Sequence, residues 1–199
     1  MAQISLYELM HGSLSVTARQ HLVYHFSGKG HENGKNWYAS GDGTDTWSSE
    51  GVTITPSSSR GEFGFGDKRQ YDRKASNIVW VSRLEFNTGG SMYNGGFYDQ
   101  DSPGVDQHGW FIHGTGVALM TADASQNFTN TSDDGGSSVF ADKFNVYRTE
   151  SLRSSCNGHI NGLLNATKTN NLSRQNFQPA MFVYNGSAGH AKYVEAWNT

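Results

Sequence analysis

The sequence predicts an all-β protein in which two antiparallel sheets pack face to face. Aromatic residues make up 13% of the 199 residues and glycines number 24, whereas charged residues make up only 17%. Short runs of aromatic and β-branched residues recur between turn signals, and no window is dominated by strong helix formers. Each sheet must bury one apolar face, so strands without helices favour a two-layer sandwich.

The expected strands are short runs rich in apolar, aromatic and β-branched residues, some of which alternate with polar residues. The clearest one spans residues 78–86, where Ile78, Trp80, Leu84 and Phe86 would share the core face. The others are residues 21–26, 52–55, 109–113, 117–120, 144–150, 181–184 and 193–197.

Turn and loop signals separate these strands. Asn161-Gly162 predicts a type I′ turn and a tight hairpin, because both residue types accept a positive φ. Asn94-Gly95-Gly96 predicts a second turn. Residues 27–51 and 123–138 are rich in glycine and small polar residues, and we expect loops there.

The domain organisation follows from the position of the first strand. Residues 1–20 have mixed apolar spacing and predict an N-terminal arm, with Ile4, Leu6 and Leu9 available to contact a partner. Residues 21–199 contain no linker-like segment and predict one sandwich domain.

Charge and hydropathy narrow the range of partners. The net charge of −3 argues against a nucleic-acid partner. No apolar run approaches the roughly 20 residues that a membrane-spanning helix needs, and the N-terminus lacks the pattern of a signal peptide. We therefore expect synthesis in the cytoplasm without export, which the initiating Met favours over a leader already removed by processing, and no membrane partner.

The C-terminal third resembles a known superfamily. Residues 144–150, the Ile160-Asn161-Gly162 hairpin and the final run at residues 193–197 are similar to the concanavalin A-like (laminin G-like) jelly roll. This resemblance implies a two-sheet antiparallel jelly-roll sandwich. A narrower resemblance, in residues 22–26 and 193–199, is to jelly-roll structural proteins of bacteriophages, and it implies a virion component.

Catalytic motifs of the superfamily are missing from the sequence. Its retaining glycosidases carry a Glu-x-Asp-x-x-Glu strand, whereas Glu85, Glu150 and Glu195 stand alone on their expected strands. The Gln-x-His strand of its alginate lyases is not recognisable either. From the sequence we therefore predict that the protein is not an enzyme, with a polysaccharide lyase or glycosidase as the third choice of function.

One acidic segment suggests a metal site. Asp99, Asp101 and Asp106 provide hard oxygen ligands of the kind that Ca²⁺ prefers. The segment departs from the EF-hand pattern, and the alternative is a solvated loop with Asx turns around Pro103. Ca²⁺ is the one cofactor that the sequence suggests, and none is required.

Aromatic residues in the expected loops suggest a surface for glycans. Trp37, Tyr38, Trp47 and Tyr93 could stack on sugar rings, while core packing or loop anchoring is the alternative role.

Two functions from different classes follow. The first is a virion structural protein, a capsid decoration (cement) protein or a head or tail accessory protein. It would contact the major capsid protein, other virion subunits or copies of itself. The alternative is a carbohydrate-binding, lectin-like module whose partners are glycans.

Overall fold

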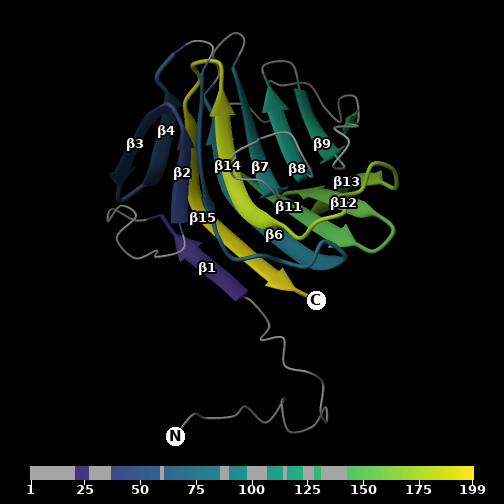
Figure 1. Ribbon diagram of the computed structural model, residues 1–199. Helices are drawn as coiled ribbons and strands as arrows, with labels where there is room; N and C mark the ends of the chain where they lie inside the picture. The colour runs from purple at the N-terminus through teal and green to yellow at the C-terminus, as the bar shows by residue number, and fades with distance from the viewer. Residues whose placement is uncertain are drawn as a thin grey trace, which may run out of the picture.

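The computed structural model describes residues 21–26, 37–58, 61–85, 90–97, 107–113, 116–122, 128–130 and 143–199. Within these ranges all regular secondary structure is β-strand, arranged as two layered antiparallel sheets (Figure 1). Within the same ranges no helix is long and apolar enough to cross a membrane.

The first layer is an eight-stranded sheet built around the two longest strands. Seven of its strands follow one path, and β1 (His21–His25) pairs with the last part of β15. In spatial order the path is β13 (Leu163–Lys168), β12 (Cys156–Ile160), β11 (Asn145–Leu152), β6 (Ala75–Leu84), β15 (Gly189–Asn198), β4 (Gly51–Pro56) and β3 (Gly43–Ser48).

The second layer is a seven-stranded sheet. In spatial order it contains β10 (Phe128–Asn130), β9 (Gly116–Ala122), β8 (Gln107–His113), β7 (Ser91–Phe97), β14 (Gln178–Tyr184), β5 (Glu62–Asp67) and β2 (Trp37–Gly41). Its central strands come from distant parts of the sequence, since β14 pairs with β7 on one side and β5 on the other. This order decides which side chains become neighbours on its two faces.

The predicted strands are confirmed, but some predicted loops are wrong. Residues 27–51 contain β2 and β3, and residues 123–138 contain β10. These three strands end their sheets. A strand with one unpaired edge and an exposed face can be polar, so alternation of buried apolar residues does not reveal it.

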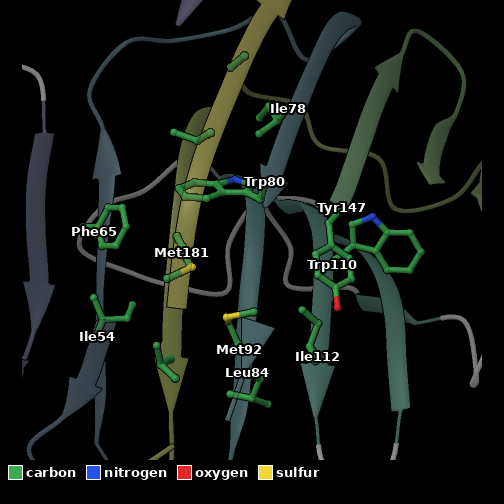
Figure 2. Packing of buried hydrophobic residues seen from close by; sticks show 14 of the residues in the cluster. Ile54, Phe65, Ile78, Trp80, Leu84, Met92, Trp110, Ile112, Tyr147 and Met181 are labelled. Carbon is green, nitrogen blue, oxygen red and sulfur yellow. The ribbon is translucent and has the colours of Figure 1, made fainter. Parts of the chain in front are cut away.

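The core between the sheets is aromatic and centres on Trp80 of β6 (Figure 2). The Phe26 ring stacks on the Trp80 indole with centroids 6.0 Å apart, and the Phe65 ring meets the indole edge-on at 6.0 Å. Ile78, Trp80 and Leu84 are buried as expected. The fourth predicted core residue, Phe86, lies outside the described residues.

Two buried polar contacts also join the layers. Asn94 of β7 donates from Nδ2 to Ser82 Oγ of β6 at 2.9 Å. His108 of β8 lies 3.0 Å from Ser151 Oγ of β11, and its Nε2 accepts the Ser173 backbone N–H at 3.0 Å. Burial, with a smaller contribution from nearby Arg73, lowers the pKa of His108 to about 3, so its imidazole is neutral near pH 7.

The hairpin predicted at Asn161-Gly162 is confirmed. Asn161 has a φ of 52° and Gly162 a φ of 85°, as a type I′ turn requires, and together they join β12 to β13. Asn161 also holds the turn against β11, because its N–H donates to the Val146 carbonyl at 2.8 Å and its Oδ1 accepts the Val146 N–H at 2.9 Å.

Replacement of Gly162 by Val should destabilise the protein by about 1–2 kcal/mol, the cost of placing a β-branched residue in the left-handed region. A Cβ at this position meets no atom within 4 Å, so the loss is purely conformational. Urea unfolding would measure it, with Leu163→Ala, an exposed position next to the turn at the start of β13, as the control. An unchanged unfolding free energy for Gly162→Val would contradict the type I′ hairpin.

Candidate functional site

The outer face of the seven-stranded sheet carries a second apolar cluster, separate from the core. Tyr93 of β7 and Ala180 and Phe182 of β14 are buried in it. Phe111 of β8 and Tyr184 of β14 pack against these three and stay partly exposed. We call these five residues the outer aromatic cluster.

Strand register brings this cluster together. Phe182 pairs directly with Tyr93, and Tyr93 pairs with Phe111, so three aromatic side chains lie side by side on neighbouring strands. The residues between them on β14, Met181 and Val183, face the opposite way and belong to the core. The central strands are therefore apolar on both faces.

Glycines explain why these rings can lie against the sheet. A Cβ on Gly109 would lie 2.6 Å from the Tyr93 hydroxyl and 2.7 Å from its ring carbon Cζ, and a Cβ on Gly64 would collide with the Phe182 ring. The Tyr93 hydroxyl donates to the Gly96 carbonyl at 2.6 Å. Both rings thus cover backbone that has no side chain of its own, and they form a floor under the partly exposed residues.

The Asn94-Gly95-Gly96 segment accordingly corrects a prediction. We expected a turn, and the structure places all three residues inside β7. Gly95 pairs with Ala180 on one side and with Gly109 on the other. Small residues are needed here for packing, and composition alone does not distinguish that need from a turn.

Phe111, His113 and Tyr184 form a short, partly exposed aromatic platform on this face. The Phe111 centroid lies 5.7 Å from the His113 ring and 6.4 Å from the Tyr184 ring. All three are only partly exposed, so the platform is supported from below. It offers apolar ring surface together with a hydroxyl and an imidazole, which suits a ligand with apolar faces and polar edges.

Carboxylates are scarce on this sheet. Its described strands contain two acidic residues, Glu62 and Asp67, both on β5. Asp67 is buried and its two oxygens accept hydrogen bonds from Arg69, at 2.7 Å from Nε and 2.6 Å from Nη2. Glu62 pairs in register with Tyr184. These strands alone therefore do not supply two free carboxylates for retaining hydrolysis.

The structure does not place the aromatic residues predicted to bind glycans together on one surface. Tyr93 was expected in a loop, and this is wrong, because it is a β7 residue with 1% exposure. Trp47 lies on β3 of the other sheet, where it packs against Phe26 of the core and donates from its indole to Asp45. Trp37 and Tyr38 belong to β2, and their side chains are not described.

Two other predicted sites lie outside the described residues. The candidate calcium ligands Asp99, Asp101 and Asp106 fall there, so the calcium prediction stays a prediction. The arm residues Ile4, Leu6 and Leu9 fall there as well. In the part of the chain that is described, no group of three His, Cys, Asp or Glu residues could hold a metal ion.

Sequence reasoning missed the platform because its members are far apart in the chain. Phe111 and His113 alternate on β8, and Phe182 and Tyr184 alternate on β14. Two aromatic residues two positions apart indicate one shared strand face, which was a usable signal. Which strands are neighbours is set by the sheet order, and local sequence does not contain it.

Comparison with known proteins gives matches at the level of structure. Neither protein-family models nor curated proteins match the chain. A Bacillus licheniformis β-glucanase superimposes with a TM-score of 0.68 and 13% identity, covering 90% of this chain and 98% of its own. The apo Crh5 transglycosylase gives a TM-score of 0.67 and 11% identity, with 90% and 84% covered. The Emp47p carbohydrate recognition domain gives 0.58 and 12% identity, with 82% and 89% covered.

The fold is a concanavalin A-like jelly roll. This confirms the fold class predicted from the C-terminal strands and the hairpin. At 11–13% identity the likeness concerns the fold alone.

Two functional predictions are corrected by these comparisons. The prediction of a virion structural protein, whether capsid decoration or head or tail accessory, is contradicted, since the similar structures include a β-glucanase, a transglycosylase and a carbohydrate recognition domain. The prediction from the sequence that the protein is not an enzyme is also contradicted. It rested on catalytic motifs missing from the sequence, and the fold is shared with a glucanase and a transglycosylase.

Replacement of Gly109 by Ala should destabilise the protein by about 1–3 kcal/mol, because the new methyl group overpacks a closed contact. It would meet the Asn94 carbonyl oxygen at 2.6 Å as well as the Tyr93 ring. Near-UV circular dichroism should change with it, since the aromatic rings shift. Gly162→Ala, in open space, should leave that signal intact. A Gly109→Ala protein with wild-type stability and spectrum would contradict the ring-on-glycine packing.

Proposed function

We propose that the protein binds carbohydrate on the outer face of the seven-stranded sheet, with Phe111, His113 and Tyr184 as the contact surface. The observation that carries the proposal is this partly exposed platform, which rests on the buried Tyr93 and Phe182 rings. A pyranose has apolar C–H faces and a rim of hydroxyl groups. The Phe111 ring suits the faces, while the Tyr184 hydroxyl and the imidazole suit the rim.

Rigidity of the platform favours binding. Phe182 and Tyr93 are fixed by packing on glycines, and Tyr93 is also fixed by its hydrogen bond to Gly96. The partly exposed rings lie on this fixed floor and lose little conformational freedom when a sugar docks. Binding energy is therefore not spent on ordering the site.

The names of the similar structures support the proposal. The set includes a β-glucanase, a transglycosylase and a carbohydrate recognition domain. Trp37 and Tyr38 remain candidates for additional contacts, because β2 ends the same sheet and Tyr38 pairs in register with Gly66. Trp47, on the other sheet, has no part in the platform.

A carbohydrate-active enzyme is the second candidate, favoured by the fold shared with the β-glucanase and the transglycosylase. Retaining hydrolysis needs two carboxylates about 5–5.5 Å apart. Asp67 is held by Arg69, so at least one member of such a pair would come from outside the described strands of this sheet. Incubation with a soluble β-glucan separates the candidates, because hydrolysis releases new reducing ends and binding alone does not.

Phe111→Ala and Tyr184→Ala should each raise the Kd for β-glucan oligosaccharides about five- to tenfold. Loss of one aromatic contact costs about 1 kcal/mol, and 1.4 kcal/mol is tenfold in Kd. Isothermal titration calorimetry, preceded by a glycan array to choose the best sugar, measures the change. Trp197→Ala, on β15 of the other sheet, is the matched control and should bind as the wild type does.

Two results would contradict the proposal. One is a wild-type protein that binds no glycan on the array. The other is equal Kd values for Phe111→Ala, Tyr184→Ala and Trp197→Ala, since the platform would then contribute nothing specific.

A further inference from the structure

A cavity of about 230 Å³ lies on the outer face of the eight-stranded sheet. Its base is a row of three directly paired residues, Thr53 on β4, His190 on β15 and Arg83 on β6. Lys192, Phe144 and Glu50 also line the cavity. The cavity therefore belongs to the other sheet from the aromatic platform.

Two cations share one aromatic ring in this cavity. The Lys192 ammonium lies 4.3 Å from the Phe144 ring centroid, and the Arg83 guanidinium carbon lies 5.3 Å from it. Lys192 reaches this position because the pairing of β15 with β6 shifts register between Ala191 and Tyr193. Two positive charges on one ring repel each other, and an anion placed between them would relieve that repulsion.

The carboxylates nearby leave these cations incompletely satisfied. Glu85 is 3.8 Å from Arg83 and Glu50 is 3.6 Å from Lys192, both beyond hydrogen-bond distance. Glu85 makes its short contact, 2.8 Å, with His190 Nε2 instead. The Glu50 side chain is 83% exposed, so water screens its attraction to Lys192.

The Arg83 guanidinium also has a donor without an acceptor. Its Nε is buried and has no hydrogen-bond partner in the part of the chain that the structure describes. Buried charged donors are nearly always paired. An unused guanidinium N–H beside a second cation and an open cavity is suited to an acceptor that a bound ligand brings.

We propose that this cavity binds a small oxyanion, a carboxylate or sulfate group, between Arg83 and Lys192. The planar guanidinium fork matches such groups with two parallel hydrogen bonds, and the ammonium adds a point charge. The cavity is smaller than the roughly 300–1,000 Å³ of drug-sized sites, so the ligand is a small molecule or one group of a larger one. The site is independent of carbohydrate binding on the other sheet.

Thermal-shift and calorimetric titrations with sodium sulfate and sodium acetate test this, against sodium chloride at equal ionic strength. We expect a saturable rise in Tm with sulfate, acetate or both, and the responding salt identifies which oxyanion the site prefers. Arg83→Gln and Lys192→Gln should each weaken binding at least tenfold. Glu50→Gln should tighten it several-fold, since it removes the competing carboxylate.

Arg153→Gln is the control, because it removes the same charge from an exposed position at the end of β11, outside the cavity lining. Binding by this variant should equal that of the wild type. The proposal is overturned if neither salt shifts Tm beyond chloride, or if Arg153→Gln loses as much binding as Arg83→Gln. Lys192→Gln and Glu50→Gln keep the test decisive if Arg83→Gln fails to melt cooperatively.

Discussion

Aromatic rings lying on cross-strand glycines are the contact on which the proposed site depends. Tyr93 covers Gly109, and Phe182 covers Gly64. Without this packing the central strands of the seven-stranded sheet would bury only their core face, and the outer face would have no fixed floor. Because both faces are packed, residues 179–183 of β14 are buried without interruption. The platform of Phe111, His113 and Tyr184 is built on this doubly packed region.

The strands and the hairpin were predictable because their signals are local. Ile78, Trp80 and Leu84 show the period of a strand, and Asn161-Gly162 fits the φ values of a type I′ turn. The strands β2, β3 and β10 were missed because they end their sheets and tolerate polar residues. The central strand β7 was missed for the opposite reason, since the glycines that receive a ring resemble a turn.

The site itself was not predictable from the sequence in the same way. Tyr93, Phe111 and Phe182 become neighbours through pairings of β7 with β8 and β14, which local patterns do not specify. The aromatic residues chosen from loop-like composition included Trp47, which the fold uses against its core. Function was misjudged for a related reason, because a missing Glu-x-Asp-x-x-Glu motif describes one catalytic solution and not the whole use of a fold. The two sheets differ in outer chemistry, one presenting aromatic rings and the other a pair of loosely paired cations.

The most direct test of carbohydrate binding on the seven-stranded sheet is an NMR titration of the labelled protein with a β-glucan oligosaccharide. The proposal predicts saturable shift changes in the aromatic side chains of Phe111, His113 and Tyr184, and in the backbone amides of β8 and β14. Amides of β4, on the opposite sheet, should stay unchanged. Shift changes confined to Trp47 and the strands around it would contradict the proposed site. The absence of any shift change at every oligosaccharide concentration would contradict it as well.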